Sequence, residues 1–169
     1  MGKYDGGAMN VLDRKILAWG QVEQAHQAQK AGRSQQAIHH YHRSLENYLS
    51  AEAYTYLAWA HSVRGDLDEA IATCHRAIAV DPNYGNPYND IGAYLIEQGR
   101  LDEAIPWLEK ATNAKRSDSY CFPWMNLGRI HERRQHWVQA AHCYSQASQC
   151  DDTYKPAAKS LSRVLGLLN

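Results

Sequence analysis

The amino-acid sequence predicts an all-α fold built from stacked helix-turn-helix repeats, an α-solenoid. The main observation is that residues 54–82 and 88–116 align column by column at a constant offset of 34 residues. In both stretches a glycine is followed two residues later by the run Leu-Asp-Glu-Ala-Ile. Apolar residues in both recur three and four positions apart, which is the spacing of one helix face. Such a repeat is typical of stacked helical architectures, whose function lies on a surface that several repeats form together.

Composition narrows the class of protein. Of 169 residues, 44% are apolar, which is enough for a core, although length alone fits one globular domain as well as a short solenoid. Eighteen basic and eighteen acidic residues give a formal net charge of zero, so there is no basic field to attract nucleic acid or an anionic membrane. No apolar run approaches the roughly 20 residues of a membrane span, and no secretory signal opens the chain. We expect a soluble cytoplasmic protein without a nucleic-acid partner or direct membrane insertion.

The cysteines indicate neither a metal site nor a disulfide. Cys74, Cys121, Cys143 and Cys150 form no Cys-x-x-Cys pair and no Cys/His pattern with the usual zinc spacing. We therefore expect four reduced thiols.

The first repeat is the least regular one. Residues 9–31 have the apolar spacing of a helix with Asn10 as a candidate N-cap, and residues 34–48 predict a second helix with Ser34 as a candidate N-cap. Together they form a degenerate unit at about residues 18–50.

Three further units and a last helix complete the predicted domain. The units are expected at about residues 51–84, 85–118 and 121–153, with a capping helix at about 156–168 that covers the open end of the stack. All of them belong to a single predicted domain, residues 9–169. Residues 1–8 contain three glycines and no apolar period, so we expect them to be disordered or tag-like.

Three positions interrupt the regular pattern. Pro106 lies inside a predicted helix, which it should kink or loosen near its start. Two residues are added between the third and fourth units, in the loop at residues 115–120. Gln135 stands where the earlier units have a turn glycine, so it must accept a less favourable backbone conformation or reshape the turn.

The repeat columns resemble the tetratricopeptide repeat, whose unit has the pattern Trp-x2-Leu-Gly-x2-Tyr followed by Ala, an aromatic residue and Pro. The best matches are Trp124, Leu127 and Gly128, then Tyr88, Ile91 and Gly92, then Tyr54, Leu57 and Ala58. Ala70, Ala104 and Ala140 occupy the column in which paired helices cross. The resemblance covers about residues 18–168. It implies a right-handed superhelix that serves as a protein-binding scaffold, without catalysis and without a cofactor.

The same resemblance implies that the first helix of each unit lines a concave groove. This face selects Trp19, Val22, His26, Thr55, Trp59, Asn89, Phe122, Asn126, Arg129 and Arg133. Asn89 and Asn126 would hydrogen-bond the backbone of a bound peptide, while Trp59 and Phe122 would anchor apolar side chains. One alternative is that Trp19 and Trp59 only pack between repeats.

Arg129 and Arg133 lie one helical turn apart and could meet an acidic side chain or carboxylate of a ligand. The alternatives are a salt bridge to Glu132 or Glu97, or simple solvation. Some family members bind the C-terminal carboxylate of a chaperone with a Lys and an Asn on one first helix, an Asn on the next, and a Lys and an Arg on the third. Other residue types occupy those positions here in every register, so binding of a chaperone tail by this carboxylate clamp is not expected.

Two residue patterns suggest chemistry, but each has a simpler explanation. His39 and His42 lie three residues apart on one helix face, yet only Glu46 is near enough to complete a metal site. A solvated outer face explains them. The Asp-Glu pairs at residues 68–69 and 102–103 look like catalytic carboxylates, but they recur because acids are favoured near a helix N-terminus. We therefore predict no enzyme activity and no metal site.

The sequence thus predicts a non-catalytic adaptor that binds a peptide segment or partner protein in its concave groove. The alternative is a structural, self-associating subunit of a larger assembly of the membrane-associated or secretion type, so that a homo-oligomer is left open. A third, enzymatic hypothesis would require an activity that depends on His39 or His42.

Overall fold

The computed structural model describes residues 9–151 and 153–168, so the expectation for residues 1–8 lies outside the described residues. Within these ranges the chain forms nine α-helices. They are α1 Val11–Lys30, α2 Ser34–Asn47, α3 Ala51–Val63, α4 Leu67–Val80, α5 Asn86–Glu97, α6 Leu101–Thr112, α7 Cys121–Arg133, α8 Trp137–Cys150 and α9 Lys155–Leu168. The all-α prediction is confirmed.

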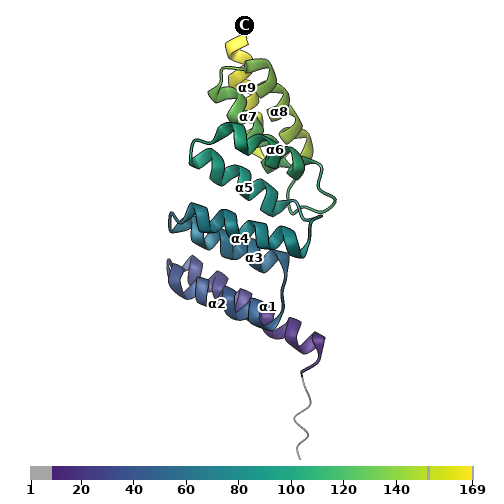
Figure 1. The fold of residues 1–169 in the computed structure, drawn as a ribbon. Helices are drawn as coiled ribbons and strands as arrows, with labels where there is room; N and C mark the ends of the chain where they lie inside the picture. The colour runs from purple at the N-terminus through teal and green to yellow at the C-terminus, as the bar shows by residue number, and fades with distance from the viewer. Residues whose placement is uncertain (1–8, 152, 169) are drawn as a thin grey trace, which may run out of the picture.

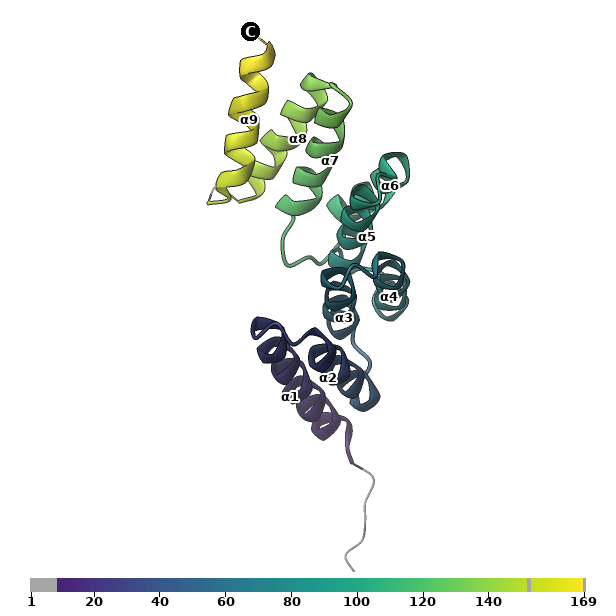
Figure 2. The same ribbon diagram turned by 90° about the vertical axis from the view of Figure 1, so that its left-hand side faces the viewer.

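The helices pack in consecutive pairs, α1 with α2, α3 with α4, α5 with α6 and α7 with α8, and α9 packs on α8. The pairs stack into an elongated, curved solenoid with α9 at its C-terminal end (Figures 1 and 2). Figure 2 shows α1, α3 and α5 on one side of the stack and α2, α4 and α6 on the other. This is the predicted solenoid of about four helix pairs and a capping helix.

Small residues allow the paired helices to approach closely. Ala37, Ala70, Ala104 and Ala140 are fully buried, as expected for the crossing column. In the fourth pair Gly128 lies directly against the ring of Tyr144, and a Cβ atom at this position would come within 2.6 Å of the Tyr144 Cδ1 atom. The glycine and alanine columns therefore set the distance between helices.

The turn within each of the first four pairs uses a left-handed backbone conformation. Gly32, Gly65 and Gly99 have φ angles of 71°, 85° and 78°, and Gln135 has a φ angle of 60°. The expectation that Gln135 would adopt an unfavourable conformation is confirmed, because residues with a Cβ atom rarely adopt this region.

Helix caps were predicted with mixed success. Asn10 does cap α1, since its side-chain oxygen accepts a hydrogen bond from the Asp13 N–H at 2.9 Å. The prediction for Ser34 is wrong: it is the first residue of α2, and Arg33 precedes it without a side-chain cap. Pro106 lies inside α6 and does not end that helix.

The added loop before α7 fastens three helix pairs together. The Gly85 N–H donates to the Arg116 carbonyl at 2.7 Å, and the Arg116 N–H donates to the Asn83 carbonyl at 3.1 Å. The Arg116 guanidinium pairs with Asp81 at 2.7 Å and Glu52 at 2.8 Å, and lies 4.0 Å from the centre of the buried Tyr84 ring. This loop therefore connects neighbouring helix pairs through hydrogen bonds and ion pairs.

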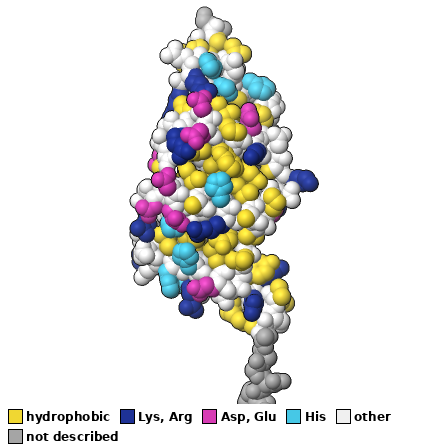
Figure 3. Space-filling model, in the orientation of Figure 1, with side chains coloured by type: hydrophobic (Ala, Val, Ile, Leu, Met, Phe, Trp, Pro, Cys, Tyr) yellow, Lys and Arg dark blue, Asp and Glu magenta, His cyan; other side chains and the backbone are white. Residues whose placement is uncertain are grey.

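Part of the apolar surface on the α4 and α6 side is explained by packing between repeats. Figure 3 shows hydrophobic side chains gathered along the middle of this face, with charged and histidine side chains around them. Leu67, Ile71, Ile105 and Trp107, which belong to these two helices, are only partly buried but pack against the main core. These side chains on α4 and α6 therefore belong to the packing between repeats.

The state of the cysteines and the character of the helices both bear on where the protein could function. Cys74, Cys121 and Cys143 are buried, Cys150 is exposed, and all four are free thiols. In the described part of the chain, no helix is both long and apolar enough to cross a membrane.

Candidate functional site

The candidate site is a recess of about 580 Å³ between three successive first helices, α3, α5 and α7. We call it the central recess. It is lined by Trp59, Ser62, Ala93, Tyr94, Ile96, Glu97, Gly99, Arg129 and Arg133. The structure thus brings together three predicted groove residues, Trp59, Arg129 and Arg133. Tyr94 was not predicted, because it is nearly buried and its contribution to the lining depends on how the repeats stack.

The recess exists because the middle repeat carries a small residue between two large ones. Trp59, Ala93 and Arg129 occupy equivalent positions in the first helices of successive repeats, so they are neighbours along the stack. The alanine side chain leaves open the space that a larger side chain would fill. Trp59 therefore forms one wall of the recess, and Arg129 forms the opposite one.

Trp59 supplies the apolar wall. It exposes 49% of its surface, and Val63, one helical turn further along α3, is also exposed. A tryptophan that served only for packing between repeats would be covered, so this alternative does not account for the exposed half. Trp19 and Phe122 are exposed as well, although the Phe122 ring lies edge-on to Tyr154 at a centroid distance of 5.5 Å.

Arg129 and Arg133 supply the cationic wall, and neither forms an ion pair among the described residues. Arg129 reaches the Asn126 side-chain oxygen at 3.4 Å, and Arg133 reaches the Ile96 carbonyl at 3.3 Å. In contrast, ion pairs hold Arg43, Arg64, Arg76, Arg100, Arg116, Arg134 and Arg163. The two groove arginines therefore retain most of their hydrogen-bond donors.

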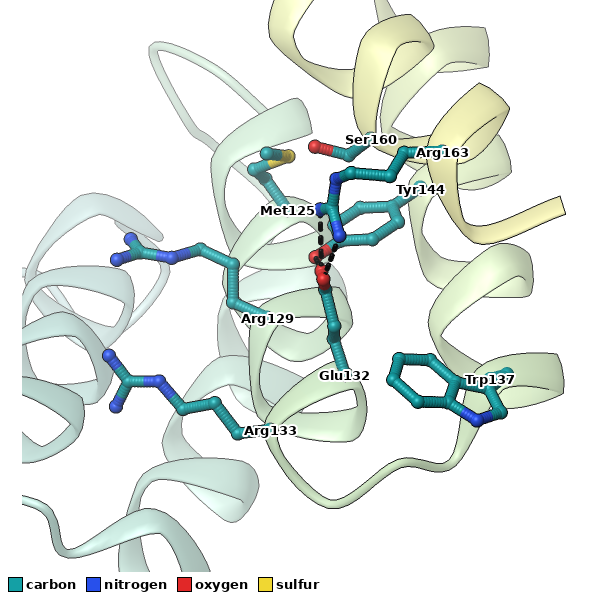
Figure 4. A pocket seen from close by; sticks show the side chains of 8 residues that line it. All are labelled: Met125, Arg129, Glu132, Arg133, Trp137, Tyr144, Ser160 and Arg163. Atoms are coloured by element: carbon teal, nitrogen blue, oxygen red, sulfur yellow. Dashed lines mark hydrogen bonds and ion pairs between the residues drawn. The ribbon is translucent and has the colours of Figure 1, made fainter. Parts of the chain in front are cut away.

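Glu132, one of the two predicted intramolecular partners, is occupied elsewhere. It accepts hydrogen bonds from Arg163 on α9 and, at 2.6 Å, from the Tyr144 hydroxyl. The hydrogen bond from Arg163 lowers the pKa of Glu132, and that from Tyr144 adds to the effect. Figure 4 shows Arg129 and Arg133 extending away from this cluster. No ion pair joins Glu97 to either arginine within the described ranges, so the predicted salt-bridge alternatives are not realised.

A second recess of about 470 Å³, the C-terminal recess, adjoins the same arginines (Figure 4). It is lined by Met125, Arg129, Glu132, Arg133, Trp137, Tyr144, Ser160 and Arg163. Because Arg129 and Arg133 line both recesses, they lie between the two. Arg163 was missed as a lining residue because α9 was predicted only as a cap.

The two asparagines hydrogen-bond each other. Asn126 donates to the Asn89 side-chain oxygen at 3.0 Å, and Asn89 donates to Asp90 at 3.2 Å. Asn126 is only 9% exposed. Its predicted contact with a peptide backbone is therefore corrected: this amide joins α5 to α7. Burial raises the pKa of the neighbouring Asp90 to about 7.

Of the other predicted groove residues, Thr55 and Val22 are buried and His26 is partly buried. Thr55 is 5% exposed, and its hydroxyl donates to the Ala51 carbonyl at 2.7 Å, so it completes the helix backbone instead of meeting a ligand. Val22 is 3% exposed and lies at the base of a separate recess between α1 and the start of α3. His26 is partly buried against the edges of Tyr41 and Tyr56, and this burial lowers its pKa.

Neither histidine spacing nor the acidic pairs form a chemical site. The described residues contain no group of three or more histidine, cysteine, aspartate or glutamate side chains that could hold a metal ion. Asp68 accepts a hydrogen bond from Gln98 at 2.8 Å, and Asp102 pairs with Arg134. Besides lying in the first turn of a helix, as predicted, each of these acids thus fastens its own repeat to the next.

Comparisons with known proteins agree with this architecture. A model of the tetratricopeptide repeat matches residues 49–117, whereas comparison with curated protein sequences gives no match. Structural similarity extends much further along the chain. A PilF structure from Pseudomonas aeruginosa has a TM-score of 0.81 and 21% identity, over 90% of this chain and 69% of that one. PilW, described as a type IV pilus biogenesis factor, has a TM-score of 0.77 and 16% identity, over 89% and 69%. A MamA structure has a TM-score of 0.68 and 20% identity, over 86% and 89%. At these identities the likeness concerns the fold.

Proposed function

We propose that this protein is a non-catalytic adaptor that binds a partner segment on its concave face. Residues 49–117 match the tetratricopeptide repeat, whose repeats typically bind protein partners, and the fold is that of such proteins. The observation that carries this proposal is the central recess, where a half-exposed tryptophan lies opposite two arginines that form no ion pair with any described residue. Tryptophan and arginine are the residue types that most often dominate the binding energy of protein interfaces.

The small side chain of Ala93 gives a direct test. Ala93→Leu should fill the central recess and abolish capture of the partner, as should Trp59→Ala, because both remove the pocket for an apolar side chain. Ala79→Leu is the matched control, since Ala79 is an exposed alanine on the second helix α4. Proteins captured from a native lysate would be compared by quantitative mass spectrometry. Recovery of the same proteins with wild type and both recess variants would refute the proposal.

The cellular setting is also a proposal. Four free thiols, three of them buried, suit the reducing environment of the cytoplasm. Fractionation of cells that express the chain from its own gene would test this: recovery outside the cytoplasmic fraction would contradict it. The likeness to PilF and PilW makes an assembly apparatus a reasonable place to seek the partner.

Self-association is a second candidate function, and exposed apolar residues on α1 favour it. Leu12, Ile16 and Trp19 lie on one helix face, and each is more than half exposed. If this face joins two copies, sedimentation should show a dimer that Leu12→Ser with Ile16→Ser converts to a monomer. A wild-type monomer at high concentration would exclude this candidate.

A further inference from the structure

The position of the unpaired arginines in the fold indicates more about the ligand. Arg14 and Arg33 also lack an ion pair in the described residues, but neither lines the central or the C-terminal recess. Arg129 and Arg133 combine unused donors with a recess that also contains a half-exposed tryptophan side chain, Trp59. A guanidinium has five donors, and the contacts of these two arginines use one donor each, at the long distances of 3.4 and 3.3 Å. Most of their hydrogen-bonding capacity is thus available to a ligand.

The arrangement suits a carboxylate. Residues four apart on a helix have neighbouring side chains, so both guanidinium groups can approach one acidic group from the same helix face. Arginine binds carboxylates in a bidentate, charge-assisted manner that is roughly twice as strong as a neutral hydrogen bond. The recess lining contains one acidic residue, Glu97, and two arginines, so the recess has an excess of positive charge.

Trp59 defines the second requirement. It lines the same recess from α3, with Ala93 and Ile96 of α5 between it and the arginines. A ligand that fills the recess must therefore present a large apolar side chain toward α3 and an acidic one toward α7. One extended segment satisfies both conditions when these two residues are separated by a few positions, since its side chains project at intervals of about 3.3 Å along the chain.

We propose that the central recess is specific for an acidic peptide segment, in which an Asp or Glu side chain pairs with Arg129 and Arg133 while a large apolar side chain packs on Trp59. This inference rests on the proposed function and specifies its ligand. The carboxylate is that of a side chain within the segment, because exposed apolar residues also lie outside the recess lining, Trp19 on α1 and Phe122 at the start of α7, and offer the segment further contacts. A bound segment can therefore continue past the recess.

The experiment uses a phage library of random peptides selected on the purified full chain. Wild type should enrich peptides with Asp or Glu a few positions from Trp, Phe or Leu. An enriched peptide is then synthesised with an amidated C-terminus, together with a version in which the acid is changed to its amide. This change should weaken binding to wild type about tenfold, the usual effect of losing a charge-assisted hydrogen bond.

A double-mutant comparison assigns the effect to the arginines. Arg129→Gln with Arg133→Gln should bind the acid and amide peptides equally, while Arg14→Gln with Arg33→Gln should behave as wild type. Circular dichroism would check that each variant is folded. Enriched peptides that require Trp59 but carry no acid, or that need a free C-terminus, would overturn the inference and leave the proposed function standing. Failure to enrich any peptide that depends on Trp59 would overturn both.

Discussion

Replacing Gly128 by alanine should destabilise the protein strongly, although alanine is the better helix former. The added Cβ atom would lie within 2.6 Å of the Tyr144 Cδ1 atom, so the ring must move. Tyr144 is fully buried, and its hydroxyl donates to Glu132, which also holds Arg163 of α9. Overpacking costs about 1–3 kcal/mol, and a lost hydrogen bond to a charged group costs about 1.5–3 kcal/mol. The gain in helix propensity offsets only about 1 kcal/mol.

We therefore expect a net loss of about 2–4 kcal/mol in the free energy of unfolding for Gly128→Ala. Urea denaturation followed by circular dichroism measures it. Gly20→Ala is the matched control, because a Cβ atom there meets nothing within 4 Å and the residue lies inside α1. This control should stabilise the protein by up to about 1 kcal/mol. Equal urea midpoints for Gly128→Ala and wild type would refute the reasoning, since the helix crossing would then tolerate extra volume.

Three further predictions concern the turn at Gln135, the contacts of Arg116 and the partly buried carboxyl group of Asp90. Gln135→Gly should raise the melting temperature, because it relieves a left-handed conformation that costs a non-glycine residue about 1–2 kcal/mol; a lower melting temperature would contradict this. Arg116→Gln should lower stability at neutral pH and remove part of the acid dependence of unfolding. Its hydrogen bond lowers the pKa of Asp81, so the stabilisation is complete above the ordinary pKa of that carboxyl and is lost as the pH falls through the lowered one. If Arg116→Gln and wild type lost stability in the same way as the pH falls, the stabilising role of the Arg116–Asp81 pair would be contradicted. Asp90→Asn should flatten the decline in stability at higher pH. The pKa of Asp90 is raised to about 7, so its neutral form favours the fold at low pH and this contribution is lost as the pH rises through 7. Parallel melting curves of wild type and Asp90→Asn from pH 5 to 8 would exclude this effect.

The fold could be predicted from the sequence because each repeat needs the same residue types at the same packing positions. Ala70 and Ala104 recur at the helix crossing, and the turn glycines recur before them, so each column could be recognised without coordinates. Ser34 was misplaced because a serine near a helix start is favoured as a cap, whereas here the helix already includes it. Local pattern alone does not give the boundary to the residue.

The candidate site was predicted less completely, because position on a helix face does not determine exposure. Trp59 and Thr55 both belong to the predicted groove, yet Trp59 is half exposed while Thr55 is buried against its own helix backbone. Asn89 and Asn126 were both predicted to bind a peptide backbone, but they hydrogen-bond to each other, and this contact depends on how α5 and α7 approach. These contacts join different repeats, and their geometry follows from the stacking angle, which the sequence pattern does not contain.

The difference between buried and concave columns explains why the repeats specify a fold but no single ligand. At the helix crossing, every repeat needs a small side chain, and Ala37, Ala70, Ala104 and Ala140 supply it. The concave column of Trp59, Ala93 and Arg129 does not need a small side chain in every repeat. It therefore contains an aromatic, a small apolar and a cationic side chain in successive repeats. Because successive repeats place this column side by side, a change at one position reshapes the pocket between its neighbours without altering the core. Ligand specificity in this chain should therefore change by substitutions at Ala93 and its neighbours while the stability of the stack is retained.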